Sequence, residues 1–130
     1  MEKDFDTWNV KKKAIDSDLG RIFCYPREIW WCSLGTNIGF EQNGTGEYFD
    51  RPVVVVRTFG KNAFLGAALT SKNKQGKFYF PIGLVEDRQA LVILSQVRFI
   101  DTKRLIRKGG VLDEEIFNQL KNALQQTLFN

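Results

Sequence analysis

Short apolar segments alternate with glycine-rich or charged turns along most of this chain, which is typical of an antiparallel sheet. The expected strands are residues 27–34, 53–59, 63–70, 77–82 and 90–100. Four consecutive valines, Val53 to Val56, open the second strand, so we expect it to be buried on both faces. The pattern therefore predicts about five short antiparallel strands.

The pattern changes to a helical period near the end of the chain. We expect a helix from Asp113 to about Leu128, with Asp113 as the N-cap, because an aspartate there accepts hydrogen bonds from free backbone N–H groups. Apolar residues that recur every third or fourth position predict one face packed on the sheet: Ile116, Phe117, Leu120, Ala123, Leu124 and Leu128. Residues 102–106 are expected to form a helical turn, and Gly109–Gly110 a hairpin or short break.

The first residues have a different pattern from the strands. Residues 2–17 are helix-like, and Gly20 and Pro26 mark a linker after them. We divide the chain into an N-terminal extension, residues 1–26, and one domain, residues 27–130. The lysines of the extension (Lys11, Lys12 and Lys13) are interpreted as a solvated face, with contact to RNA or to a protein partner as the alternative.

These elements indicate a mainly β (α+β) fold, a small antiparallel barrel with a C-terminal helix. A chain of 130 residues can bury a single core. No apolar run approaches the about 20 residues that a membrane span needs, and the first residues lack the apolar core of a secretory signal. We therefore expect a cytoplasmic protein.

The composition limits the partners, catalytic mechanisms and metal sites that this chain can have. The net charge is +4, which suits either a nucleic acid or an acidic protein as partner. The chain has no histidine, which excludes a Ser-His triad, a histidine-pair ribonuclease mechanism and most zinc sites. Its two cysteines, Cys24 and Cys32, are too few for a disulfide framework or a four-thiolate metal site and are expected to be reduced. We expect no metal and no cofactor.

The stretch from Ile38 to Arg57 carries the clearest functional signal. A glycine-rich polar loop, residues 35–50, runs directly into the valine strand, with Arg51 and Pro52 at the junction. Long loops are usually functional or disordered, and arginine is a rigid, permanently charged donor that suits phosphate. A loop that ends on such an arginine is suited to binding a phosphodiester.

Five segments in order resemble the MazF/PemK toxin family over residues 27–128. They are REIWWCSLG, IGFEQNG followed by RPVVVV, AALTSK, LSQVRFIDTKRL and VLDEEIFNQLKNAL. The resemblance implies an SH3-like barrel with a C-terminal helix, assembled as a homodimer. It also implies a toxin that is inhibited by an acidic antitoxin, with which such toxins bind DNA.

The resemblance implies sequence-specific, metal-independent cleavage of single-stranded RNA. The 2′-hydroxyl would attack the adjacent phosphate and leave a 2′,3′-cyclic phosphate and a 5′-hydroxyl. By position, the catalytic arginine is Arg51 and the catalytic threonine is Thr70. Glu41 and Gln42 fall on the loop that covers RNA in the family, and Gln96 falls on a base-contacting strand position. We also predict that Phe40, Asn43, Ser71 and Lys72 bind RNA.

The chain departs from the family pattern before Arg51. Phe40 stands where members often have a small polar residue, and the segment TGEYFD lengthens the loop. Phe40 is interpreted either as a base-stacking residue or as an apolar anchor of the loop. A smaller departure is Ser95, where some members have an acidic residue.

Arginine stays protonated in proteins, so we expect Arg51 to stabilise the charge on the pentacovalent phosphate rather than to act as a base. Thr70 would donate to a non-bridging or leaving oxygen. The nearby carboxylates are Glu41, Glu47 and Asp50, and we predict Glu41 as the general base. In the alternative interpretation, Arg51 forms a salt bridge with Asp50 or Glu47 that orders the loop, and Thr70 caps a turn.

Two other functions remain open at this point. One is a gyrase-poisoning toxin of the related CcdB type, and the other is a non-catalytic nucleic-acid-binding barrel. The pairing of Arg51 with Thr70, together with the Glu-Gln loop, favours the nuclease.

Overall fold

The computed structural model describes residues 4–17, 22–35 and 50–130. The elements follow the order α1 (Phe5–Ser17), β1 (Glu28–Ser33), β2 (Asp50–Phe59), β3 (Ala63–Thr70), β4 (Tyr79–Val85), β5 (Arg88–Asp101), the 3₁₀ turn η1 (Thr102–Arg104), β6 (Leu105–Val111) and α2 (Glu114–Phe129). The expected fold class is confirmed: the protein is mainly β, with a helix after the last strand.

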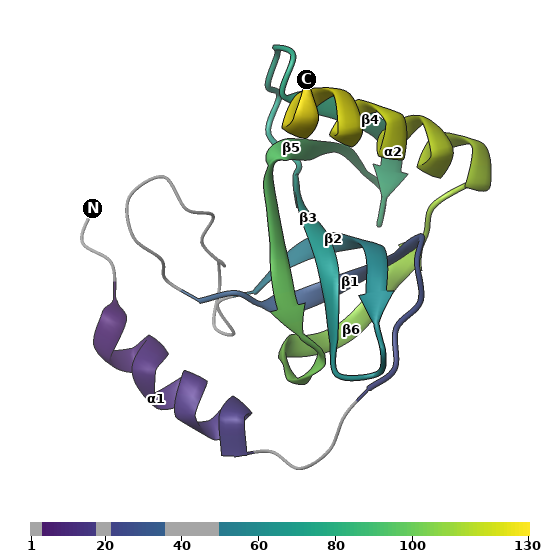
Figure 1. Ribbon diagram of the computed structural model, residues 1–130. Coiled ribbons are helices and arrows are strands. Elements are labelled where there is room, and N and C mark those ends of the chain that lie inside the picture. The colour runs from purple at the N-terminus through teal and green to yellow at the C-terminus, as the bar shows by residue number, and fades with distance from the viewer. Residues whose placement is uncertain (1–3, 18–21, 36–49) are drawn as a thin grey trace.

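All neighbouring strands pair antiparallel, in the order β4-β5-β3-β2-β1-β6. The long strand β5 pairs with β3 along most of its length and with β4 through its first half. Figure 1 shows the sheet curling, with α2 lying across one end of it. Because of this curl, residues of the two edge strands, β4 and β6, line one groove.

The run of valines on β2 separates two parts of the core. Val54 lies in one buried cluster, together with Leu120 and Leu124 of α2. Val53 and Val55 point the other way, into a cluster with Phe64 and Ile100. Successive strand residues face opposite sides of a sheet, so a strand buried on both faces must be apolar at every position. The prediction is confirmed for Val53, Val54 and Val55, whereas Arg57 and Phe59 in the second half of the strand are exposed.

The C-terminal helix begins as predicted. The Asp113 carboxylate accepts hydrogen bonds from the backbone N–H groups of Glu115 and Ile116, at 3.1 and 3.4 Å. Phe117, Leu120 and Leu124 are buried against the sheet. The expected apolar face ends earlier than predicted, because Leu128 is 44% exposed near the end of the helix.

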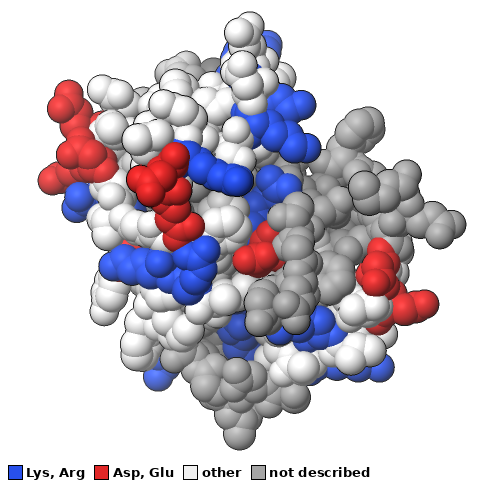
Figure 2. All heavy atoms as spheres, turned by 180° about the vertical axis from the view of Figure 1, so that it is seen from behind, with Lys and Arg blue, Asp and Glu red and all other residues white. Residues whose placement is uncertain are grey.

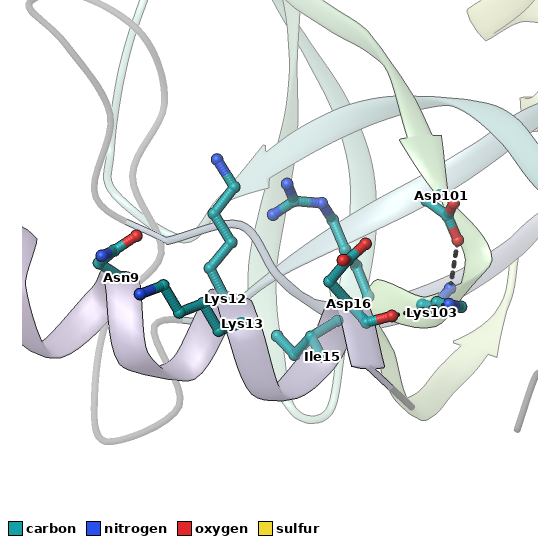
Figure 3. Close-up of a pocket in the computed structure, with 8 residues that line it drawn as sticks. Asn9, Lys12, Lys13, Ile15, Asp16, Asp101 and Lys103 are labelled. Atoms are coloured by element: carbon teal, nitrogen blue, oxygen red, sulfur yellow. Dashed lines mark hydrogen bonds between the residues drawn. The ribbon is translucent and has the colours of Figure 1, made fainter. Parts of the chain in front are cut away.

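Trp8 of the N-terminal helix packs against the barrel. Trp8 is buried and lies against Gly35, where a Cβ atom would come within 1.9 Å of the indole ring. The Arg104 guanidinium lies 5.7 Å from the ring centre. The Lys103 ammonium donates to the backbone carbonyl of Asp16 at 2.9 Å, near the end of α1 (Figure 3). None of the described helices is long and apolar enough to cross a membrane.

Three sequence predictions need correction. Gly109 and Gly110 do not form a break but lie within a sixth strand, β6, which pairs with β1. The helical turn expected at residues 102–106 is limited to the three residues of η1. Strand β2 begins at Asp50, so Arg51 and Pro52 belong to the strand rather than to its junction with a loop.

Candidate functional site

A surface cavity of about 430 Å³ lies where the start of β2 meets the end of β3, and we refer to it as the strand-end cavity. It is lined by Trp31, Arg51, Pro52, Leu69, Thr70, Ser71, Lys72, Val85, Glu86, Arg88, Gln89, Ala90 and Arg107. Most of these residues lie at the ends of strands or in the turns beside them. The sheet backbone therefore holds several polar side chains around one space.

Arg51 is held between two neighbouring strands. Its backbone pairs with Cys32 of β1, and its Nη1 donates to the carbonyl of Leu69 on β3 at 3.2 Å. Partial burial lowers the pKa of Arg51, but an arginine remains protonated at neutral pH. The guanidinium is thus a partly desolvated, positioned cation, which attracts an anion more strongly than a cation in bulk water does.

Thr70 ends strand β3 and is 7% exposed. Its hydroxyl oxygen accepts a hydrogen bond from the backbone N–H of Lys72 at 3.2 Å. Since a hydroxyl can donate one hydrogen bond while it accepts others, this contact orients the group and leaves its proton available to a ligand.

Positive charge dominates the lining of the strand-end cavity. Its basic members are Arg51, Lys72, Arg88 and Arg107, whereas Glu86 is the one carboxylate among the described lining residues. Figure 2 shows Lys and Arg side chains gathered near the middle of the face opposite the view of Figure 1, with a few acidic ones among them. The cavity is therefore suited to an anion such as a phosphodiester.

Trp31, Glu86 and Arg107 form a contact group at one side of the cavity. Glu86 and Asp87 have positive φ angles of 49° and 65° and form the two-residue turn between β4 and β5. This turn places the Glu86 carboxylate against both terminal nitrogens of Arg107. The hydrogen bond with Arg107 is the main reason that the pKa of Glu86 is lowered. None of these three residues was predicted from the sequence as a site residue.

The predicted site residues fall into three groups. Arg51, Thr70, Ser71 and Lys72 lie together on the strand-end cavity. Gln96 lies elsewhere, in a separate cavity of about 240 Å³ that Leu34, Val53 and Arg98 also line. The remaining predicted residues, Phe40, Glu41, Gln42 and Asn43, lie outside the described residues, as does Glu47.

The other chemical expectations concern the cysteines and metal ligands. Cys24 and Cys32 are free and buried, and burial raises the pKa of the Cys24 thiol to about 11. Such thiols are poor nucleophiles at neutral pH. In the part of the chain that the structure describes, no three His, Cys, Asp or Glu side chains are grouped so that they could hold a metal ion.

Residues 25–128 match the family model described as PemK-like, MazF-like toxin of type II toxin–antitoxin system. Among curated proteins, the chain is similar to the Endoribonuclease EndoA of Bacillus subtilis (strain 168). The two are 28% identical over 110 residues, which cover 78% of this chain and 90% of that protein. The family match covers the whole sheet and α2 but leaves α1 outside.

Solved structures share the fold at low sequence identity. The crystal structure of MazF (Form-I) from Deinococcus radiodurans has a TM-score of 0.67 and 17% identity, with 82% of this chain and 97% of that chain covered. An endoribonuclease in complex with its cognate antitoxin from a Mycobacterial species has a TM-score of 0.63 and 14% identity, with 81% and 94% covered.

Proposed function

Because the chain belongs to the PemK-like, MazF-like family of type II toxins, we propose that it is a sequence-specific, metal-independent endoribonuclease that cleaves single-stranded RNA. The observation that carries the proposal is the meeting of Arg51 and Thr70 on one cationic cavity. The endoribonuclease name of its Bacillus subtilis relative supports the same class of reaction.

The proposed reaction is an attack within the RNA strand. The 2′-hydroxyl of one nucleotide gives its proton to a base, and its oxygen bonds to the adjacent phosphorus. The bond from phosphorus to the 5′-oxygen then breaks, and that oxygen takes up a proton. The products are a 2′,3′-cyclic phosphate and a 5′-hydroxyl.

Arg51 and Thr70 have complementary tasks in this reaction. The phosphate gains negative charge in the pentacovalent transition state, and preorganised donors stabilise such charge most. Arg51 is preorganised by its bond to the Leu69 carbonyl and lines the cavity, where its positive charge stabilises a phosphate oxygen. Thr70, oriented by the Lys72 N–H, donates to a non-bridging or leaving oxygen.

The general base is assigned to Glu41, which the sequence places on the loop before Arg51. Glu86 lies on the cavity but is a weaker candidate, because its pairing with Arg107 lowers its pKa and so its basicity. A general base works best when its pKa lies near the operating pH.

The partners and the domain division are part of the proposal. We infer a homodimer that is inhibited by an acidic antitoxin, whose negative charge suits the strand-end cavity. The complex of a mycobacterial structural neighbour with its antitoxin supports the antitoxin as a partner. Residues 27–130 form the toxin domain, and residues 1–26 are an added extension. The family match, which begins at residue 25, agrees with this division.

The test is to incubate the purified protein with a long unstructured RNA in excess EDTA and to map the fragment ends. We expect discrete fragments with cyclic phosphate and 5′-hydroxyl ends, and no fragments with Arg51→Ala. Arg27→Ala is a matched control, because Arg27 is also half-buried and donates to a backbone carbonyl, that of Leu112, away from the cavity.

Arg27→Ala should lower the melting temperature yet cleave RNA. Cleavage by folded Arg51→Ala at the rate of the unaltered protein would refute the assignment of the site. If the folded, unaltered protein leaves RNA intact, a DNA supercoiling assay with gyrase tests the CcdB-type alternative. RNA binding without products would instead indicate a non-catalytic barrel.

A further inference from the structure

Arg107 is held in place more firmly than an exposed arginine usually is. Its side chain is 53% exposed, yet both terminal nitrogens contact the Glu86 carboxylate. Its guanidinium carbon also lies 4.8 Å from the centre of the Trp31 ring. A two-point contact with a carboxylate restricts the plane of a guanidinium, and the ring supports one face of it. The exposed part is therefore a flat and preorganised surface.

The surroundings of Trp31 keep this arrangement compact. A Cβ atom at Gly109 would lie 3.3 Å from the indole nitrogen and 3.5 Å from a Glu86 oxygen, so a larger residue would crowd both. The indole N–H lies close enough to the Glu86 carboxylate to help lower its pKa. It makes no hydrogen bond of good geometry within the described residues. The indole ring thus packs under the ion pair.

The Trp31–Arg107 stack adjoins the proposed catalytic arginine. Arg51 pairs with Cys32 of β1, and Arg107 pairs with the preceding residue, Trp31, from the other side of the same strand. Two strand spacings separate the backbones of Arg51 and Arg107, about 10 Å in total. Both side chains line the strand-end cavity. A strand of RNA with its phosphate at Arg51 would therefore bring a neighbouring nucleotide toward Arg107.

We propose that Arg107, supported by Trp31 and held by Glu86, is a stacking platform for a nucleobase of the RNA beside the cleaved phosphate. This inference rests on the proposed ribonuclease function and adds a base-binding subsite to it. Glu86 already neutralises much of the charge of Arg107, which makes the guanidinium a poor phosphate ligand. The flat face of the guanidinium can still contact a ligand, and bases stack on arginine planes as well as on aromatic rings.

The test compares binding of RNA strands that lack one base at a time. The probe is a short single-stranded RNA around a mapped cleavage position, with hydrogen in place of the attacking 2′-hydroxyl so that it is bound but not cut. If no cleavage position is found, a mixed-sequence RNA of the same length is scanned instead. Each nucleotide in turn is replaced by an abasic one, and the dissociation constant is measured.

For the unaltered protein we expect one position near the cut where loss of the base weakens binding about 5- to 150-fold, the range for one stacked base. In Arg107→Lys that penalty should fall below about 2-fold, since an ammonium keeps the charge but has no plane to stack on. Arg88→Lys is the matched control, because Arg88 lines the same cavity but makes no ring contact within the described residues. It should keep the full penalty.

The outcomes separate this inference from the function on which it rests. If RNA is cleaved but Arg107→Lys keeps the abasic penalty of the unaltered protein, the platform is refuted and the nuclease stands. If RNA is bound with a penalty that Arg107→Lys removes, but is not cut, the platform stands and the nuclease is refuted. A purely structural role for Arg107 would lower the melting temperature of Arg107→Lys and leave the abasic penalty unchanged, which also overturns the inference.

Discussion

Two basic cavities of similar size lie on this molecule, and their cations differ in what they already bind. One is the strand-end cavity, with Arg51, Lys72, Arg88 and Arg107. The other, of about 340 Å³, lies between α1 and η1 and is referred to as the helix cavity; its cations are Lys12, Lys13, Lys103 and Arg104. Each cavity has four cations, so a count of charges does not distinguish them.

In the helix cavity, two of the four cations attach α1 to the barrel. Lys103 donates to the Asp16 carbonyl, at the end of the helix (Figure 3). Arg104 donates to the Ser33 carbonyl at 3.0 Å and lies over the Trp8 ring. The cavity also contains the carboxylates of Asp16 and Asp101, which offset part of its positive charge.

In the strand-end cavity, the corresponding contacts position donors for a ligand. The bond to the Leu69 carbonyl fixes the Arg51 guanidinium at the wall of the cavity, and Thr70 accepts one bond while its proton stays available. We infer that a cation serves a ligand when its fixed contacts orient it at the wall of an open cavity. The two cations of the helix cavity that attach α1 to the barrel are structural.

After the loss of Arg51, the largest expected effect follows from removing the Thr70 hydroxyl. Thr70→Val keeps the branched shape in a buried strand end but leaves no donor for the phosphate, so the cleavage rate should fall about 10²- to 10³-fold. Thr70→Ser restores the hydroxyl and should keep most of the activity. Single-turnover RNA cleavage, with the enzyme in excess over the RNA, measures the rates of both variants. Equal rates for the valine and serine variants would remove Thr70 from the proposed chemistry.

Undocking α1 should have the next largest effect, and it should affect structure rather than catalysis. Trp8→Ala removes the buried ring that contacts Gly35 and Arg104 and should weaken docking of the helix by about 3 kcal/mol. Faster amide hydrogen exchange or proteolysis within α1 would report this loss. Phe5→Ala is the control, since Phe5 lies on the same helix and is 48% exposed.

RNA cleavage by Trp8→Ala should stay within about 2-fold of the unaltered protein, because neither Gly35 nor Arg104, which contact Trp8, lines the strand-end cavity. A large loss of cleavage with the barrel intact would mean that the helix cavity takes part in function. The contrast between the two cavities would then be wrong.

Most of the fold could be predicted from the sequence because its signals are local. The valine run gave a strand buried on both faces, and Asp113 gave the start of α2. Strand β6 was missed because Ile106, Arg107 and Lys108 are exposed and two glycines follow them, a pattern that resembles a turn. Its pairing with β1 comes from the curl of the sheet, which no local pattern records.

The candidate site likewise contains some residues that could be predicted from the sequence and others that could not. Arg51 and Thr70 were found because each lies in a recognisable segment of the family motif. Glu86 and Arg107 are 21 residues apart and meet only through the β4–β5 turn and the curl of the sheet. Glu86-Asp87 could have been read as a two-residue turn, but nothing in the sequence indicates what that turn faces. Contacts between distant segments could therefore not be predicted from the sequence.

A smaller difference between the cavities should appear in the salt dependence of RNA binding. If Lys72 neutralises a phosphate, Lys72→Gln should reduce the slope of log affinity against log salt by about 0.7, the value for one contact with a single strand. Lys12→Gln is the matched control from the helix cavity and should leave the slope unchanged. Fluorescence anisotropy with a labelled RNA over a salt series measures both slopes. An equal decrease in the two variants would assign RNA to both cavities.

The smallest expected effect concerns the pH dependence of the Glu86–Arg107 pair. Hydrogen bonding to Arg107 lowers the pKa of Glu86 below its ordinary value of 4.5 in the folded protein. The pair therefore stabilises the fold above that pH, and its contribution is lost as the pH falls through the lowered pKa. Both side chains are largely exposed, so the contribution should be below about 1 kcal/mol.

Urea unfolding of the unaltered protein, Glu86→Gln, Arg107→Gln and the double variant measures the coupling between the two residues. Arg107 also interacts with Asp50 and packs on the Trp31 ring, so each single substitution disturbs more than the ion pair. Only the coupling energy isolates the interaction between Glu86 and Arg107. We expect a small favourable coupling at neutral pH that disappears in acid. A coupling that persists well below the pKa of Glu86 would mean that packing on Trp31, rather than charge, holds Arg107. The stacking platform would then not depend on the charge of the Glu86 carboxylate.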